Sequence, residues 1–244
     1  MKMRLASLSL VLFPLLTAQA GGVDPTLPNL VPIFPDRLDG NFTVTNRLGA
    51  PTLEFEILTA NIGGQDWIRP PIDRDVSCVT SRQYFRMPQT HQYTMYWYDP
   101  DLQDYVLVDQ RRKDTICIQD DGSRGNNPLI NCLQEHGPVF PCGCSSSLYG
   151  PGTGNGVSRG WADSYFRNLL GQWSFMGDRT GDFLLSAELD PDQELQADDL
   201  LDRERDATHD DNTSWVFFSY YGGFGPVLEN VYVLHTFDPV CPAP

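Results

Sequence analysis

Lysine is almost absent from this 244-residue chain, which contains two lysines among 17 basic residues. Lys2 is the second residue of the sequence, and Lys113 lies in RRKDTICIQDD, residues 111–121. One explanation is compositional, because arginine supplies the same surface charge. The other is chemical: an amine can act as a nucleophile and be joined covalently to a partner, which a permanently protonated guanidinium cannot easily do. The rest of the chain has to decide between them.

Histidine is also scarce, with four residues in the whole chain. No spacing among them supports a histidine-based catalytic triad, and no P-loop, H-E-x-x-H or dinucleotide-binding pattern is present. These absences disfavour the common serine hydrolases, nucleotide-binding enzymes and zinc proteases. His235 lies between apolar residues, which is typical of a packed histidine, and His209 lies in an acidic, solvated stretch.

No hydrophobic run is long enough for a comfortable membrane span. The chain opens with MKMRLASLSLVLFPLLTAQA, in which two cations precede a short apolar run and an Ala-Gln-Ala site. This pattern is typical of a secretory signal peptide. We therefore expect residues 1–20 to be removed after Ala20, and residues 21–244 to form one secreted, extracellular domain without a membrane span.

Basic residues are outnumbered by 32 acidic ones, and the formal net charge is −15. Such a surface repels nucleic acid and anionic membranes and attracts cations. The most acidic segment, 190–211, is either a solvated loop with a short helix or a loose cation site. A cationic substrate or a metal ion suits this charge, although solubility alone would also explain it.

Six cysteines in a secreted chain suggest up to three disulfides, whose pairing the sequence leaves open. Two N-glycosylation sequons, at Asn41 and Asn212, are consistent with a secreted glycoprotein.

Short alternating or aromatic segments predict an all-β fold: a single β-sandwich-like domain with long disulfide-stapled loops and little helix. In the segment 53–58, apolar and acidic residues alternate, which predicts a strand with one solvated face. Residues 91–108 are expected to form a hairpin, and residues 120–160 to be mostly loop. The remaining predicted strands are 115–118, 183–189, 215–221 and 231–237.

Six segments occur in an order that resembles the catalytic domain of the lysyl oxidase family, over about residues 28–221. In the fourth, G-x-S-x-G-x-x-D-x-Y is followed by a Gln-Trp pair. The six are NLVPIFPDRL (29–38), LEFEILTANIGGQDWIRP (53–70), RRKDTICIQDD (111–121), GVSRGWADSYFRNLLGQW (156–173), GDFLLSAELDPDQEL (181–195) and DDNTSWVFFSY (210–220).

The resemblance implies a role for the rare lysine. In that family a lysine and a tyrosine are joined into lysyl tyrosylquinone, and the matching positions are Lys113 and Tyr165. The implied activity is copper-dependent oxidative deamination of primary amines, such as peptidyl lysine or small amines, to aldehydes with release of hydrogen peroxide and ammonia. Asp163, two residues before Tyr165, is the candidate base for proton removal.

The chain departs from the family at the copper site. The family has three alternating histidines before a strand that ends in Tyr-Asp, and an ungapped match to Tyr98-Asp99 places Arg86, Pro88 and Thr90 there. His91 is the nearest histidine and the candidate copper ligand. One imidazole holds copper weakly. This departure leaves open a catalytically inactive, secreted binding or structural module with the same fold.

A third possibility is an unrelated secreted carbohydrate-binding module, in which aromatic residues of 93–98 and 215–221 would stack on sugars.

Overall fold

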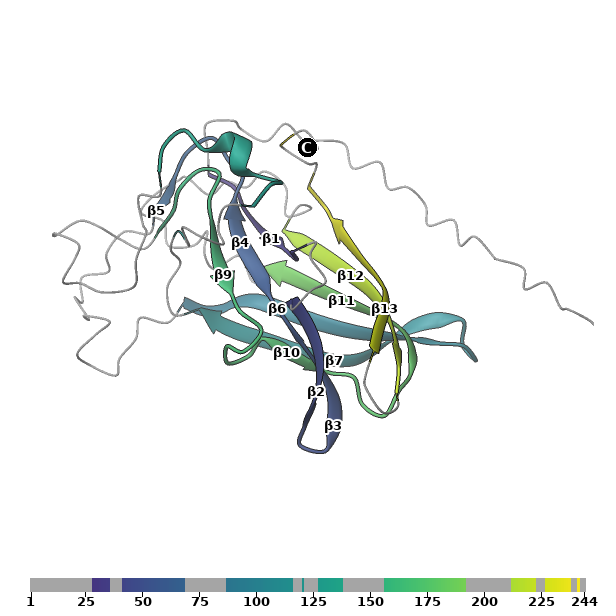
Figure 1. The fold of residues 1–244 in the computed structure, drawn as a ribbon. Coiled ribbons are helices and arrows are strands. Elements are labelled where there is room, and N and C mark those ends of the chain that lie inside the picture. Colours follow the sequence, from purple (N-terminus) through teal and green to yellow (C-terminus); the bar gives the residue numbers. More distant parts are fainter. Residues whose placement is uncertain are drawn as a thin grey trace, which may run out of the picture.

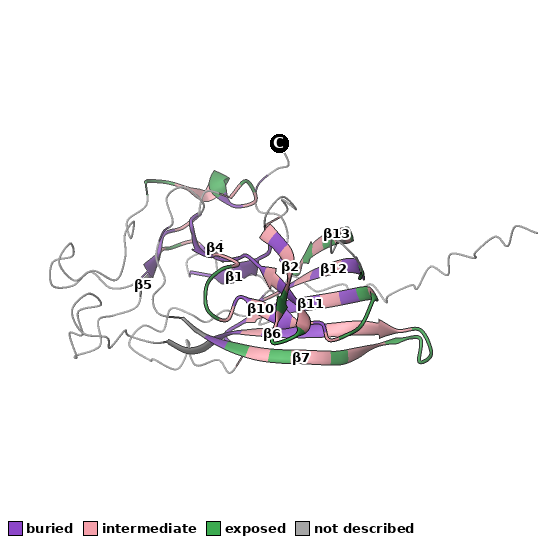
Figure 2. Cartoon of the chain, turned by 60° about the horizontal axis from the view of Figure 1, so that its bottom comes forward, coloured by how far each residue is buried: buried purple, intermediate pink, exposed green. Residues whose placement is uncertain are grey.

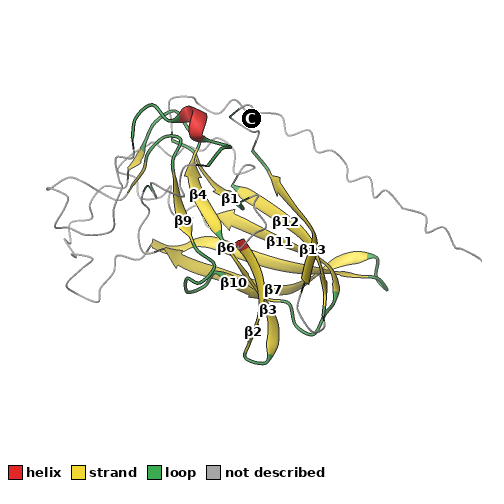
Figure 3. Cartoon of the chain, viewed as in Figure 1, coloured by secondary structure: helices red, strands yellow, loops and turns green. Residues whose placement is uncertain are grey.

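The computed structural model describes residues 28–35, 41–68, 87–115, 120, 127–137, 156–191, 212–222, 227–237 and 241. Over these residues the fold is all-β, as the sequence predicts, with a short 3-10 helix, η1 (Asn131–Leu133), in one connection (Figure 3). Within this part of the chain, no helix has the length and apolar character that a membrane crossing requires.

The largest unit is a five-stranded antiparallel sheet in the order β13-β12-β11-β6-β7 (Figure 1). The predicted hairpin over 91–108 is confirmed and extended, because its strands continue well beyond both predicted ends. The strands of this sheet are β6 (Met87–Asp99), β7 (Asp104–Thr115), β11 (Gly181–Leu189), β12 (Thr213–Tyr221) and β13 (Val227–His235).

Three smaller antiparallel sheets complete the described structure. One has the order β1-β4-β9, a second β10-β3-β2, and a third pairs β5 with β8. Their members are β1 (Leu30–Ile33), β2 (Phe42–Arg47), β3 (Ala50–Phe55), β4 (Ile57–Asn61), β5 (Trp67–Ile68), β8 (Gly156–Val157), β9 (Ala162–Tyr165) and β10 (Trp173–Phe175).

The main core lies between the five-stranded sheet and the two three-stranded sheets. Alternating residues of β6 point into it, since His91, Tyr93 and Met95 are all fully buried. They meet Phe55 and Ile57 from the opposite sheets. Figure 2 shows the resulting pattern, with buried residues in the interior and exposed ones along β7 and the connecting turns. This packing of sheet on sheet agrees with the sandwich-like prediction.

The segment 53–58 differs from its prediction. The chain leaves β3 at Phe55 and enters β4 at Ile57, so these residues belong to two different sheets. At the change, the amide of Glu56 donates to the carbonyl of Asn41 at 2.9 Å. Glu56 is 9 % exposed, so the expected solvated face is wrong at this residue.

Several other segments for which the sequence makes predictions lie only partly within the described residues. Residues 156–157 of the expected loop form β8, whereas 116–119 and most of the acidic segment 190–211 lie outside the described residues. His235 packs against Phe237, and its Nδ1 forms a hydrogen bond with the Ser214 hydroxyl at 3.0 Å. Both contacts fit the packed histidine that the sequence predicts. Asn212, the second sequon, is buried at the start of β12, and Asn41 is more exposed.

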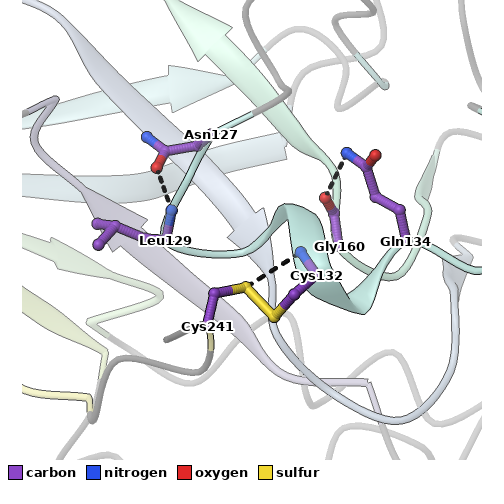
Figure 4. Close-up of a disulfide and its surroundings, with 6 residues drawn as sticks. All are labelled: Asn127, Leu129, Cys132, Gln134, Gly160 and Cys241. Carbon is purple, nitrogen blue, oxygen red and sulfur yellow. Dashed lines mark hydrogen bonds between the residues drawn. A yellow bond between two sulfur atoms is a disulfide. The ribbon is translucent and has the colours of Figure 1, made fainter. Parts of the chain in front are cut away.

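A disulfide joins Cys132, in η1, to Cys241 near the C-terminus (Figure 4). The amide of Cys132 also donates to the Cys241 sulfur at 3.0 Å. Beside it, the Gln134 side chain donates to the carbonyl of Gly160 at 3.0 Å and ties the η1 connection to the turn before β9. The disulfide therefore holds a loop against the sandwich, as the sequence predicts. Cys78, Cys117, Cys142 and Cys144 lie outside the described residues.

Removal of this disulfide by Cys132→Ala with Cys241→Ala is expected to lower the free energy of unfolding by about 2–5 kcal/mol. The bond closes a span of 109 residues, so the unfolded chain gains much conformational freedom when it is lost. Urea unfolding followed by tryptophan fluorescence measures the change. An unfolding midpoint equal to that of the wild type would contradict the expectation.

Candidate functional site

The hairpin β6–β7 places His91 and Lys113 side by side. The two residues are direct partners in its antiparallel ladder, so their side chains leave the same face of the sheet. That face is the inner one: His91 is fully buried and Lys113 is 8 % exposed. A lysine this deeply buried is unusual, because its charge loses hydration there.

The strand β9 places Asp163 and Tyr165 on the opposite side of the site. The two residues are two positions apart, so they share one face of the strand. β9 pairs with β4, where Thr59 lies opposite Asp163 and Ile57 opposite Tyr165. Asp163 is 5 % and Tyr165 6 % exposed.

The four residues predicted from the sequence meet between these two sheets. The Lys113 amine nitrogen lies 4.2 Å from the centroid of the Tyr165 ring. The His91 ring approaches the same tyrosine edge-on, with the centroids 5.2 Å apart and the planes at 63°. Asp163 is close enough for its charge to act on Lys113. Residues from three separate parts of the chain thus form one buried cluster.

Burial changes the protonation of the lysine. Loss of hydration lowers the pKa of Lys113 from its ordinary 10.5 to about 7, and the nearby Asp163 carboxylate acts in the opposite direction. Near neutral pH a substantial fraction of Lys113 is therefore the free amine, which is the nucleophilic form.

His91 is held as a neutral imidazole. Burial, and secondly the charge of Lys113, lowers its pKa to about 3. Its Nε2 lies 2.9 Å from the Thr59 hydroxyl and its Nδ1 lies 3.1 Å from the Thr90 hydroxyl. Because the Thr90 hydroxyl also donates to the Lys113 carbonyl, the bonding assigns the proton to Nδ1 and leaves Nε2 to accept from Thr59.

The described residues do not form a copper site by themselves, and the prediction of copper stays a prediction. Nowhere in the described ranges do three or more His, Cys, Asp or Glu side chains gather in a way that could hold a metal ion. Both nitrogens of His91 are engaged by threonine hydroxyls, so coordination through Nε2 would require the Thr59 bond to be broken. Arg86 and His209 lie outside the described residues, and His136 lies beside Asp66, with its Nε2 3.7 Å from the carboxylate.

Gln172 completes the cluster, and the sequence assigned no role to it. Gln172 accepts hydrogen bonds from the Lys113 amine at 2.8 Å and from the Tyr93 hydroxyl at 2.6 Å. Burial raises the pKa of Tyr93, so its hydroxyl keeps its proton. The only sequence signal was the Gln-Trp pair that ends the segment 156–173. A buried glutamine cannot be told from an exposed one by spacing alone.

Some of the aromatic residues that could stack on sugars are buried, and the others are partly or fully exposed. Tyr93 and Phe218 are buried in the core, and Tyr221 is half-exposed. The carbohydrate-binding interpretation stays a prediction.

In comparisons with known proteins, the chain matches no family model, and no curated protein is significantly similar to it in sequence. The resemblance to the lysyl oxidase family therefore stays a prediction.

Proposed function

We propose that this protein is a secreted amine oxidase of the lysyl oxidase type, whose organic cofactor is made when dioxygen oxidises the Tyr165 ring to a quinone and the Lys113 amine adds to it, followed by a second oxidation by dioxygen. The observation that carries the proposal is the position of the Lys113 amine, 4.2 Å from the centroid of the Tyr165 ring. The two residues lie on strands of different sheets, and each is buried. A lysine and a tyrosine in this arrangement can be joined with little movement of the backbone.

The protonation of the cluster supports this proposal. A lysine with a pKa of about 7 can supply a free amine at neutral pH, whereas an arginine at the same place would stay charged. The joined cofactor would supply a quinone carbonyl that reacts with a primary amine and accepts its electrons. This chemistry gives position 113 a requirement for lysine.

The proposal gives roles to two side chains beside Tyr165, Asp163 and His91. Asp163 shares a face of β9 with Tyr165, and this position supports a role for its carboxylate as the base that takes a proton from an amine bound to the cofactor. His91 packs its neutral ring against the edge of Tyr165 and excludes water from that side.

The substrate we propose is a cationic primary amine, either a lysine side chain of an extracellular protein or a small amine. A net charge of −15 attracts such molecules by long-range electrostatics. Attraction of this kind raises the rate of encounter and weakens as salt screens it.

One observation favours a second candidate. Both nitrogens of His91 bond to threonine hydroxyls, so the site has a stable arrangement without a metal. The second candidate is therefore a secreted binding or structural module in which Lys113 and Tyr165 remain separate.

Peptide mapping by mass spectrometry distinguishes the two candidates. The chain is secreted from a eukaryotic host with copper in the medium, reduced and digested. The amine oxidase predicts one species that joins the Lys113 and Tyr165 peptides, with one oxygen atom gained and four hydrogen atoms lost. Tyr165→Phe is the matched control, because it keeps the ring and removes the joined species. Separate, unmodified peptides in the wild type would reject the enzyme and support the module.

A further inference from the structure

Gln172 is the centre of the hydrogen bonds around Lys113. It lies at the end of the turn before β10 and is fully buried. Its amide makes four contacts. The oxygen accepts from the Lys113 amine at 2.8 Å and the Tyr93 hydroxyl at 2.6 Å, and the nitrogen donates to the carbonyls of Tyr165 at 3.3 Å and Phe55 at 3.4 Å.

These contacts fix which way the amide points. Backbone carbonyls only accept hydrogen bonds, so the two carbonyls require the amide nitrogen on their side. The oxygen must then face Lys113 and Tyr93, which both offer a donor. In the opposite orientation, the amide nitrogen would face the two donors and the amide oxygen would face the two backbone carbonyls. The orientation of Gln172 is therefore set by the backbone of Phe55 and Tyr165, and not by the lysine.

The same turn also confines the stem of the lysine. Gly171 has φ +86°, and a Cβ atom there would lie 3.4 Å from Cγ of Lys113. This distance shows that the lysine stem lies close against the turn, and the positive φ explains why glycine stands there. A long side chain with several rotatable bonds is held at its stem by Gly171 and at its amine by Gln172.

We propose that Gln172 is the positioning residue of the site: its backbone-locked amide oxygen holds the Lys113 amine over the Tyr165 ring through a neutral acceptor. The inference rests on the proposed function for its purpose, since it explains how the two partners are aligned before they are joined. Neutrality matters because a carboxylate in the same place would favour the charged ammonium form, which is not a nucleophile.

Nuclear magnetic resonance tests this placement independently of activity. The protein is made with 13C-labelled lysine in a medium without copper, so that Lys113 stays unmodified. The two lysines of the chain give at most two Cε signals, and Lys113→Met identifies the one from Lys113. In the wild type we expect a nuclear Overhauser contact between the Lys113 Cε protons and the Tyr165 ring. Its absence from the folded wild type would overturn the proposal.

Two variants at position 172 separate positioning from general stability. Gln172→Leu removes the acceptor, and we expect the contact with Tyr165 to weaken and the Lys113 titration midpoint to fall. Gln172→Glu is of equal size and supplies a charge, and we expect the midpoint to rise by about one pH unit or more. A purely structural role would not move the midpoint in opposite directions. Unchanged contacts and midpoints in folded variants would overturn the inference.

Tyr93→Phe is the control. It removes the other donor to Gln172 and keeps the aromatic packing, so Lys113 should retain its contact with Tyr165 and stay within about 0.5 pH unit of the wild-type midpoint.

The joined-peptide yield links the placement to function. With copper in the medium, Gln172→Leu should lower the joined fraction about tenfold, and Tyr93→Phe should change it by less than about twofold. If wild type forms no joined species, the amine oxidase proposal fails, and the magnetic resonance results alone decide the role of Gln172. If wild type and Gln172→Leu join equally well, the positioning role is wrong and the amine oxidase stands.

Discussion

Replacement of Lys113 by methionine is expected to abolish release of hydrogen peroxide from primary amines, with a fall of about 1,000-fold or more. Methionine keeps an unbranched apolar stem where Lys113 packs against Gly171, and it removes the amine beside Tyr165. The variant removes the cost of burying the lysine charge, and we expect the fold to remain intact although the buried Asp163 carboxylate loses the nearby positive charge. A peroxide-coupled assay with a small primary amine and with a lysine-rich polypeptide measures the change.

The control uses the neighbouring exposed residue. Arg112→Lys places an additional amine on the outer face of β7, one residue from the site. This variant should keep wild-type activity, and the double variant Arg112→Lys with Lys113→Met should stay inactive. Activity in the double variant would show that the position of the lysine over Tyr165 is not what the reaction needs.

Lys113→Arg is a less clean substitution. Arginine cannot lose its proton, so it would place a permanent charge in a site where lysine can become neutral. We expect this variant to lose stability as well as activity, which is why methionine is the better comparison.

Stability of the unjoined protein is expected to rise as the pH increases from about 7 to about 10. The pKa of Lys113 is about 7 in the folded protein and 10.5 without the fold. Between these values the unfolded chain binds a proton that the folded chain does not, so the free energy of unfolding increases with pH. Below pH 7 both states are protonated and the cost of the buried charge is fully present. Above about 10.5 both are neutral and the cost is gone.

The increase should be roughly 2–3 kcal/mol between pH 7.5 and pH 9.5. Urea unfolding at several pH values, on protein made without copper, measures it. Subtraction of the same series for Lys113→Met removes the contributions of other titrating groups, such as Tyr93. Parallel curves for wild type and Lys113→Met would show that Lys113 keeps an ordinary pKa in the folded protein.

The long strands could be predicted because burial on one face leaves an alternating pattern. In β6, His91, Tyr93 and Met95 alternate with less buried residues, and this period identifies a strand without help from the fold. The break at Glu56 could not be predicted in this way. Alternation continues through it, and only the tertiary structure shows that the chain passes from one sheet to another.

The short strands of the site could not be predicted from sequence patterns, for a related reason. β9 is the four-residue stretch Ala-Asp-Ser-Tyr, which has little intrinsic preference for a strand, and its pairing with β4 decides its conformation. Lys113 and Tyr165 were singled out by composition and by resemblance. Their closeness, and the part played by Gln172, depend on how three distant segments pack.

The register of the β6–β7 hairpin shifts between Met95 and Tyr96, where β7 accommodates one extra residue. On the turn side of this bulge, Tyr96 pairs with Leu107, and beyond it Met95 pairs with Asp109, which leaves Val108 unpaired. Loss of the codon for Val108 would make the ladder continuous from the turn to His91 and keep Lys113 opposite His91. Loss of any one codon between 109 and 112 would turn Lys113 to the outer face of the sheet. The placement of Lys113 on the inner face therefore depends on the length of the hairpin as well as on its sequence.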